Sequence, residues 1–424
     1  MTILILGSGA REHALAARLA GEPGVARIVC APGNAGMEAL GAVAPVDISD
    51  PDAVLALADR EAVTLTVVGP ELPLAAGVAD RFIAAGRPIL GPTRAAARLE
   101  TSKVWAKQFM ARHHVPTARF VVAESVDTAR AVIDDGGLGW PLVVKADGLA
   151  AGKGVVLAAD ADEARQVAGQ MLAGERFGEA GRKVVFEECL EGPEVSFFVL
   201  TDGHHATVLG SAQDHKRAHD GDRGPNTGGM GAFAPSPLMD DALQDLVMRD
   251  IVQPVLAGMR DEDHPYRGFL YCGLMLTADG PMVIEFNARL GDPEAQVILP
   301  LVDEPLLPLV DAAAAGALPA RPIRLSRQPH VGVVVASRGY PDRFETGKPI
   351  SGLAEAASVE GVHVYHAATA RRDGGVVTAG GRVLTVVGTG PDYASAIARA
   401  YAGVDCITFD GAYCRRDIGS KAIA

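Results

Sequence analysis

Long apolar runs are missing from this chain, and so is a basic segment ahead of its first apolar stretch. Cysteine is scarce, with five residues in 424, and no two of them form a C-x-x-C pair. The first absence argues against a signal peptide and a membrane span. Scattered cysteines in odd number predict reduced thiols, so we expect a cytoplasmic protein.

Positive charge is also in deficit, because the formal net charge is −13 and the pI is about 5.3. This balance argues against a nucleic-acid partner and against an anionic membrane surface. Small anionic substrates remain compatible with it, provided that the cations that bind them are local. The composition is otherwise that of a globular chain with large cores, and the length allows roughly three domains of about 150 residues.

The first glycine-rich turn lacks two features of a dinucleotide-binding motif. Gly7-Ser-Gly-Ala-Arg-Glu-His13 joins an apolar strand to a helical stretch, but its sixth position is Glu12 instead of glycine. The second strand, 27–30, is not followed by an acidic residue for a ribose hydroxyl. A dehydrogenase is therefore disfavoured. Such a turn can still direct backbone N–H groups at an anion, and a purely structural turn stays open.

Three loops rich in glycine and proline follow the predicted parallel strands of the first hundred residues. They span 7–13, 31–36 and 69–73, and they carry Arg11, Asn34 and Glu71. Ligands of open α/β sheets bind at the carboxyl ends of the strands. We expect the three loops to share one pocket, although an isolated glutamate such as Glu71 is more often structural.

A second glycine-rich segment, 146–154, lies between two predicted antiparallel strands, 141–145 and 155–158. It is not a Walker A loop, because Gly148 and Gly152 are three residues apart and Lys153 precedes glycine. It suits a flap over a triphosphate, with Lys145 as a fixed cation and Lys153 as a mobile one. The alternative is a surface hairpin with solvated lysines.

A later strand, 183–188, ends in a bend that predicts a nucleotide contact. Its backbone groups can meet an adenine edge, and Glu194 has the spacing to take the ribose hydroxyls. Polar glycine-rich segments follow at 211–217 and 224–231, and long loops of this kind are usually functional or disordered.

The segment Val283–Gln296 carries the strongest chemical pattern. As a strand it places Ile284, Phe286 and Ala288 on one face and Glu285, Asn287 and Arg289 on the other. Carboxylate and amide oxygens suit Mg²⁺, and a guanidinium suits phosphoryl or carboxylate oxygens. The turn at 291–294 adds two carboxylates. An ordinary half-exposed strand is the alternative.

Taken together, several motifs of this sequence resemble the glycinamide ribonucleotide synthetase family (phosphoribosylamine–glycine ligases) of the ATP-grasp superfamily. The motifs lie at 7–13, 31–36, 68–71, 145–154, 213–217, 224–231 and 289–294. The resemblance implies an α/β and α+β multidomain fold. It comprises an N-terminal open parallel α/β (pre-ATP-grasp) domain over 1–102, an ATP-grasp domain over 103–325 with a flap subdomain at about 120–190, and a small C-terminal α+β domain over 326–424.

The same resemblance implies an enzyme that ligates glycine to 5-phosphoribosylamine with ATP and Mg²⁺ or Mn²⁺ through a glycyl phosphate, in purine biosynthesis, as a monomer or weak dimer. Metal binding falls to Glu285 and Asn287, and catalysis to Arg289, Asp292 and Lys145. ATP binding falls to Lys103, Lys145, Gly148, Gly152, Lys153, Gly154, Glu187, Glu188, Leu190 and Glu194. Substrate binding falls to Gly9, Arg11, Glu12, Asn34, Glu71, Asp214, Lys216, Arg415 and Arg416.

Two other functions stay open at this point. One is an ATP-grasp ligase for a different carboxylate or amine, and the other is a nucleotide-binding module without catalysis. For the tail, a solvated basic pair is the alternative to a phosphate clamp made by Arg415 and Arg416.

Overall fold

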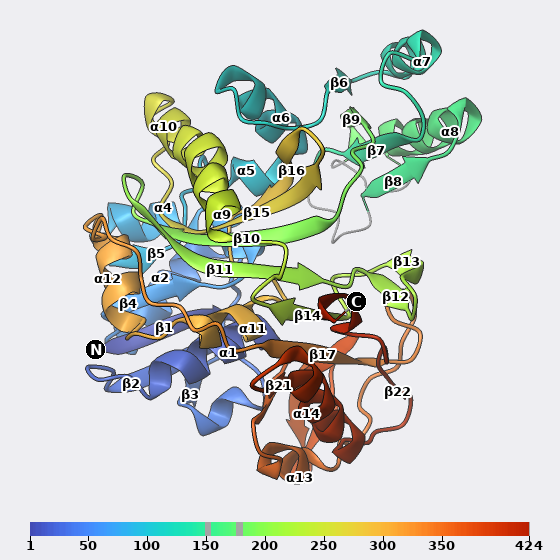
Figure 1. Cartoon of the computed structure of the whole chain (residues 1–424). Coiled ribbons are helices and arrows are strands. Elements are labelled where there is room, and N and C mark those ends of the chain that lie inside the picture. Colours follow the sequence, from blue (N-terminus) through green and yellow to red (C-terminus); the bar gives the residue numbers. More distant parts are fainter. Residues whose placement is uncertain (149–153, 175–180, 424) are drawn as a thin grey trace.

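The computed structural model describes residues 1–148, 154–174 and 181–423. Within these ranges the strands form a five-stranded, a four-stranded and a nine-stranded sheet and two separate hairpins (Figure 1). Among the described residues no helix is both long and apolar enough to cross a bilayer. All five cysteines are free thiols, as the sequence predicted.

The N-terminal sheet is parallel, with the strand order β3-β2-β1-β4-β5. Alternate residues of β1 enter two different cores, because Ile3 and Ile5 pack with α1 whereas Leu4 and Leu6 pack with α2 and α4. This confirms the predicted open α/β unit. Its elements are β1 (Thr2–Gly7), α1 (Ala10–Ala20), β2 (Arg27–Pro32), β3 (Ala42–Val43), α2 (Pro51–Arg60), β4 (Leu65–Val68), α3 (Glu71–Ala76), α4 (Val78–Ala84) and β5 (Ile89–Leu90).

The four-stranded sheet is antiparallel, with the order β6-β9-β7-β8, and helices α7 and α8 cover one face of it. Leu142 and Val144 point to these helices, so Val143 and Lys145 point to the opposite face. The elements from residue 98 onward are α5 (Arg98–Thr101), α6 (Lys103–Arg112), β6 (Phe120–Ala123), α7 (Val126–Asp135), β7 (Leu142–Ala146), β8 (Val155–Ala158), α8 (Ala161–Leu172) and β9 (Val184–Glu188).

The largest sheet runs in the order β16-β15-β10-β11-β14-β17-β21-β18, and β22 pairs with β17. It therefore continues from the predicted ATP-grasp region into the C-terminal region without a break (Figure 1). Its strands are β10 (Glu194–Thr201), β11 (Ala206–Asp214), β14 (Gly231–Ala234), β15 (Gly268–Thr277), β16 (Gly280–Asn287), β17 (His330–Ser337), β18 (Val362–His366), β21 (Arg382–Thr389) and β22 (Ala412–Tyr413).

The remaining elements cover the edges and faces of this sheet. The helical stretch over residues 241–261 is interrupted by a π-helical turn, Met248–Val252, which accommodates Pro254 where an α-helix would lose a hydrogen bond. The other elements are the hairpins β12 (Arg217–His219) with β13 (Arg223–Asn226) and β19 (Thr369–Arg372) with β20 (Gly375–Thr378), and α9 (Asp241–Val247), α10 (Gln253–Asp261), α11 (Ala295–Ile298), α12 (Leu307–Ala315), α13 (Leu353–Ser358) and α14 (Tyr393–Cys406).

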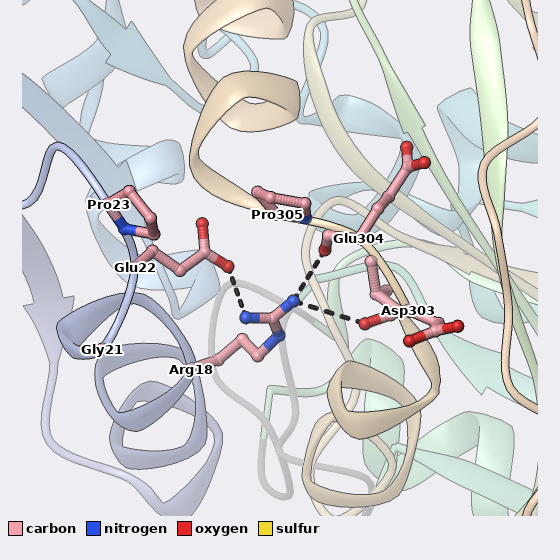
Figure 2. Close-up of a pocket in the computed structure, with 8 residues that line it drawn as sticks. Arg18, Gly21, Glu22, Pro23, Asp303, Glu304 and Pro305 are labelled. Carbon is pink, nitrogen blue, oxygen red and sulfur yellow. Dashed lines mark hydrogen bonds and ion pairs between the residues drawn. The ribbon is translucent and has the colours of Figure 1, made fainter.

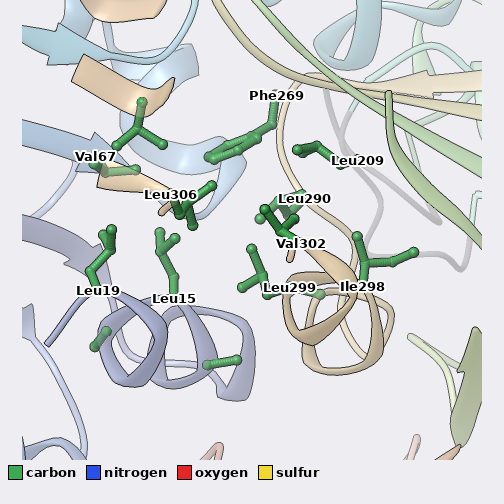
Figure 3. Packing of buried hydrophobic residues seen from close by; sticks show 14 of the residues in the cluster. Leu15, Leu19, Val67, Leu209, Phe269, Leu290, Ile298, Leu299, Val302 and Leu306 are labelled. Carbon is green, nitrogen blue, oxygen red and sulfur yellow. The ribbon is translucent and has the colours of Figure 1, made fainter. Parts of the chain in front are cut away.

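One hydrophobic core joins the N-terminal unit to the central one. Leu15 and Leu19 of α1 lie in the same cluster as Phe269, Ile298 and Leu306 (Figure 3). Burial of one such side chain stabilises the folded state by roughly 1.5–3 kcal/mol. The two units are therefore packed against each other along the whole of α1.

A surface pocket at the far end of α1 shows a polar part of the same interface (Figure 2). The Glu22 carboxylate accepts hydrogen bonds from Leu306 N at 2.7 Å and Leu307 N at 2.6 Å, so it caps the N-terminus of α12. Arg18 holds this carboxylate in place and also donates to Glu304 O at 2.7 Å. The pocket lies away from the carboxyl ends of the strands, so its polar groups serve domain docking.

Candidate functional site

The predicted metal-binding strand is real, but its alternation is not regular. Glu285 pairs with Gly273 and Val283 with Leu274, so Ile284 forms a β-bulge without a cross-strand partner. Val283 instead of Ile284 is the buried core residue, and β16 ends at Asn287. The predicted faces were therefore wrong at Ile284. The bulge aims the Ile284 carbonyl at Lys145, whose Nζ donates to it at 3.2 Å.

Glu285 carries a charge in surroundings that would otherwise neutralise it. Burial favours its protonated form, but the positive charges of Lys216, Lys103 and Lys145 outweigh this effect and lower its pKa. The amide oxygen of Asn287 lies 3.5 Å from Arg289 Nη2. An ionised carboxylate next to an amide oxygen is a donor set that suits a hard cation.

The described residues contain no group of three or more His, Cys, Asp and Glu side chains with metal-site spacing. A cation held by Glu285 and Asn287 would therefore need further oxygen ligands from outside the protein. Magnesium is commonly bound in this way, by one or two carboxylates together with substrate phosphates. The donor set fits such a shared ion.

Arg289 lies past the end of β16, between two carboxylates of other elements. Its Nη2 is 2.8 Å from Glu100 Oε1, and its Nε is 3.4 Å from Glu71 Oε2. These carboxylates raise the pKa of Arg289, so it stays protonated. Burial opposes the ionisation of Glu71, but the charges of Arg289 and Arg11 lower its pKa. Arg289 Nε is buried and makes no hydrogen bond within the described chain, so it is a donor available to a ligand.

The glycine turn at the start of α1 surrounds a carboxylate of the protein itself. Glu12 accepts a hydrogen bond from Gly9 N at 2.7 Å. A Cβ at Gly7 would lie 2.5 Å from Glu12 Cγ, and one at Gly69 would lie 2.2 Å from Glu12 Oε1. These glycines therefore leave room for Glu12. Glu12 in turn pairs with Arg11, which donates to Leu290 O at 3.0 Å.

Asp292 brings the segment after β16 against this turn. Its Oδ2 would lie 3.2 Å from a Cβ placed on Gly9. Gln296 donates to Asp292 Oδ1 at 2.9 Å, and Arg382 Nη2 lies 3.4 Å from Oδ2. Although burial opposes it, the charge of Arg382, with Arg11 next, lowers the pKa of Asp292. The structure thus gathers Gly9, Arg11, Glu71, Arg289 and Asp292 at one place.

Asn34 is fully engaged by backbone groups. Its Nδ2 donates to Ser8 O at 2.9 Å and to His366 O at 2.8 Å, and its Oδ1 accepts from Gly36 N at 3.0 Å and Met37 N at 3.3 Å. An amide makes about four hydrogen bonds, so this side chain ties the glycine loops to β18. Its predicted substrate contact is untested, and the geometry points to a positioning role.

Both arginines of the predicted phosphate clamp in the tail are paired with aspartates of the protein itself. Arg415 is buried and donates to both Asp417 oxygens at 2.7 Å, to Asp222 at 2.8 Å and to Arg217 O at 3.0 Å. Arg416 pairs with Asp405 at 2.7 Å. The contacts of Arg415 fasten the tail to the β12–β13 hairpin, so these two arginines are not carried into the function proposed below.

The nucleotide residues predicted around the flap lie on the face of the four-stranded sheet opposite α7 and α8. Lys145 Nζ lies 2.9 Å from Glu187 Oε1, and Lys103 Nζ donates to Gly148 O at 3.4 Å. Burial lowers the pKa of Lys103. Gly154 accepts a hydrogen bond from Ala146 N at 2.9 Å. Two predicted members, Gly152 and Lys153, lie outside the described residues.

The bend after β9 has less uniform surroundings. Glu188 receives a hydrogen bond from Arg119 N at 2.8 Å and pairs with its Nε at 2.6 Å, so its carboxylate faces the protein. Leu190 is partly buried. Glu194 is paired with Lys216. Ribose binding by Glu194 stays a prediction, and it would require Lys216 to share that carboxylate.

A second cluster of charges lies beside Glu285. Burial raises the pKa of Asp214, and the charges of Asp214 and Glu194 together raise that of Lys216 despite burial. Glu294 is buried, and burial together with the negative charge of Asp214 raises its pKa to about 7. The group can hold both ends of a small zwitterion such as an amino acid.

Three residues of the site were missed in the sequence: Glu100, Arg382 and Lys107. Glu100 and Arg382 contact Arg289 and Asp292 only through the fold, so no local pattern marks them. Lys107 had a signal, because it follows Lys103 by one helical turn and shares its face of α6. It lies 2.8 Å from Glu187 Oε2.

Comparison with known proteins places the whole chain in one set of relatives. Three family models match. They are described as "Phosphoribosylglycinamide synthetase, N domain" over residues 1–100, its "ATP-grasp (A) domain" over 101–295 and its "C domain" over 330–421. A phosphoribosylamine–glycine ligase of Xylella fastidiosa is 50% identical over 427 residues, covering 100% of this chain and 98% of that protein. One of Chlorobaculum tepidum is 47% identical, covering 100% of both.

Solved structures agree with these relatives. The crystal structure of phosphoribosylamine–glycine ligase from Thermotoga maritima has a TM-score of 0.87 at 35% identity, covering 98% of this chain and 100% of that one. The biotin carboxylase domain of a Hydrogenobacter thermophilus 2-oxoglutarate carboxylase, solved with MgADP and bicarbonate, has a TM-score of 0.73 at 16% identity, covering 97% of this chain and 91% of that one. This second likeness shows the shared fold alone.

Proposed function

Because this chain belongs to the phosphoribosylglycinamide synthetase family, we propose that it joins glycine to 5-phosphoribosylamine with ATP, giving glycinamide ribonucleotide, ADP and phosphate in purine biosynthesis. It is an ATP-grasp ligase. The observation that carries the proposal is the position of Arg289, which meets Glu71 of the N-terminal unit beside the nucleotide face of the central unit. Ligation requires both substrates at such a junction.

Nucleotide binding is assigned to the residues between the four-stranded sheet and β16. After Lys216, Lys103 and Lys145 are the cations that most lower the pKa of Glu285. Their ammonium groups would hold the ATP phosphates as point charges. Phe120, Glu187, Val143 and Leu157 lie in one row across the sheet by strand register, on the face that would meet the adenine.

Glu285 and Asn287 would hold Mg²⁺ or Mn²⁺ together with phosphate oxygens. When bound, the metal neutralises charge that develops on the transferring phosphoryl group. The lowered pKa of Glu285 supports this assignment, because only the ionised carboxylate is an effective ligand.

The chemistry has two steps. A glycine carboxylate oxygen forms a bond to the γ-phosphorus, and the bond to the β-phosphate oxygen breaks, which gives glycyl phosphate and ADP. The amine nitrogen of phosphoribosylamine then bonds to the acyl carbon, phosphate leaves, and the nitrogen loses a proton. Water would destroy the acyl phosphate, so the site must exclude it.

Side chains around the junction are assigned to these steps by their charge and position. The Nε of Arg289, which makes no hydrogen bond within the described chain, would donate to the transferring phosphoryl or acyl oxygen. Asp292, ionised beside Arg382, would orient the attacking amine or accept its proton. Arg11 and Glu71 would bind the phosphoribosylamine, and Asp214 with Lys216 would bind the two charged ends of glycine.

The test is an ADP-release assay with ATP, Mg²⁺, glycine and freshly prepared phosphoribosylamine, each omitted in turn. We expect steady ADP release only with the complete mixture, and glycinamide ribonucleotide as the product by mass spectrometry. Equal turnover with another amino acid, or with another amine, would replace the proposal with a different ATP-grasp ligase. Nucleotide binding without any ADP release would indicate a binding module.

A further inference from the structure

Lys107 is a buried ammonium group to which no role has been given above. Its side chain is 3% exposed, and its Nζ lies 2.8 Å from Glu187 Oε2. Nζ also donates to Thr117 Oγ1 at 2.7 Å, and Thr117 Oγ1 donates to Val283 O at 2.6 Å. Lys107 is therefore attached to the strand that carries Glu285, through a residue two positions before it.

Glu187 is shared by two lysines. Lys145 Nζ lies 2.9 Å from Glu187 Oε1 and donates to Oε2, the oxygen that Lys107 also approaches, at 3.0 Å. It donates in addition to the bulge carbonyl of Ile284. Three elements thus meet at one carboxylate: α6 through Lys107, β7 through Lys145, and β9 through Glu187. The bulge in β16 supplies the acceptor that completes this arrangement.

The net charge of Lys107, Lys145 and Glu187 determines the electrostatic attraction that this group exerts on the nucleotide phosphates. Two ammonium groups and one carboxylate leave one net positive charge. If Lys107 were absent, Glu187 would pair with Lys145 alone, and the pair would be neutral. One unit charge about 8 Å from a phosphate changes their interaction by about 2 kcal/mol at an effective dielectric constant of about 20.

We propose that Lys107 is a positioning residue that engages Glu187 and thereby leaves Lys145 with a net positive field for the nucleotide phosphates. The inference rests on the nucleotide site of the proposed function and adds a residue to it. Lys107 itself is buried between Glu187 and Thr117 and is not placed in contact with the nucleotide.

Protonation of Lys107 gives the proposal a second, independent signature. Burial lowers the pKa of Lys107 to about 8, although Glu187 opposes the change and Lys145 adds to it. The titratable groups that face Lys107 are Glu187 and Lys145, with Glu188 further away; the Thr117 hydroxyl and the Phe120 ring do not titrate in this range. Deprotonation above this pKa would have the same effect as removal of the charge.

The experiment measures the Kd of ADP with Mg²⁺ by titration calorimetry on the full chain. K107M is expected to weaken binding by about 30-fold. K107R is expected to bind within about threefold of the wild type, because arginine keeps the positive charge beside Glu187. K183M, which removes an exposed lysine just before β9 paired with Glu124, is the matched control and should bind normally.

A purely structural Lys107 would give a different pattern. Unchanged binding in K107M, or binding as weak in K107R as in K107M, would overturn the proposal. If K107M does not fold, the wild type and K107R decide, since arginine stays charged at all relevant pH values. ADP affinity should fall as pH rises through about 8 in the wild type and not in K107R, and parallel curves would overturn the proposal.

The outcomes separate this inference from the proposed function. Loss of ADP affinity in K107M together with no glycine-dependent ADP release would support the role of Lys107 and refute the ligase. Normal ligation with normal ADP binding in K107M would do the reverse. A wild type that binds no ADP with Mg²⁺ would overturn both.

Discussion

Glu100 Oε1 lies 2.8 Å from Arg289 Nη2, in a buried contact between helix α5 and the segment that follows β16. The other carboxylate oxygen accepts a hydrogen bond from Ala288 N at 2.7 Å. Glu100 thus fixes both the backbone and the side chain of the arginine segment. A guanidinium held in this way needs little reorganisation when charge develops beside it.

Replacing Arg289 by lysine should lower kcat by about 100-fold, because lysine keeps the charge but loses the Nε donor and the planar fork. The measurement is the ADP-release assay at saturating substrates, with thermal unfolding to show that the fold is kept. R327K changes an exposed arginine and serves as the control. Turnover of R289K within about threefold of the wild type would contradict the assigned role.

Glu285→Ala should abolish turnover, with a loss of at least about 1,000-fold, because the carboxylate is the charged ligand in the assigned metal site. We expect the unfolding temperature to stay close to that of the wild type. Asp279→Ala removes an exposed carboxylate from the turn between β15 and β16 and should leave turnover unchanged. Near-normal turnover of Glu285→Ala, at any Mg²⁺ concentration, would refute the metal assignment.

Asn34→Ala should lower the free energy of unfolding by about 3 kcal/mol, because four backbone groups lose their partner, two of them in buried hydrogen bonds. Urea unfolding measures this difference, and Gln328→Ala, at an exposed position, is the control. If Asn34 instead binds substrate directly, the variant would unfold like the wild type and show only a raised KM for phosphoribosylamine.

Acid should destabilise the contact between α1 and β18. His13 Nδ1 accepts a hydrogen bond from His366 N at 2.8 Å, so the folded state needs the neutral ring. Burial, with the charge of His366, lowers the pKa of His13 to about 3 from 6.5. Between these values the unfolded chain binds the additional proton, so stability falls as pH decreases, by up to about 1.4 kcal/mol per pH unit.

The measurement is urea unfolding of the wild type and H13Q from about pH 7 down to pH 4, the range in which this linkage acts. H13Q should show a smaller loss of stability, because glutamine supplies a neutral acceptor at every pH. H204Q, at an exposed histidine, should follow the wild-type curve. Identical slopes for H13Q and the wild type would show that His13 does not titrate as described.

The sequence predicted the regular elements well wherever local patterns decide them. The strand Val155–Ala158 has the predicted ends, and Val184–Glu188 begins one residue after the predicted start. Apolar runs bounded by glycine and proline carry that information by themselves. The division into three domains at 102/103 and 325/326 stays a proposal. The largest sheet continues across the second of these boundaries, so the sheet itself does not mark a domain boundary there.

Prediction was less complete where distant segments decide the geometry. The bulge at Ile284 depends on what Lys145 and Thr117 require of β16, and neither is near it in sequence. Asn34 and Arg415 are polar residues in motif positions, but only the fold shows that backbone groups and aspartates occupy their hydrogen-bonding atoms. Residue type marked the site, and long-range pairing determined each residue's part in it.

Strand β14 pairs with β11 on one side and with β17 on the other. A truncated gene that stops short of residue 330 would leave one flank of β14 with unpaired amides and carbonyls, a template for self-association. The separate C-terminal fragment would carry the complementary unpaired edge on β17. The two fragments should therefore be insoluble when produced apart and should reassemble when produced together. The boundary between β14 and β17 is thus a suitable place to split the enzyme for complementation.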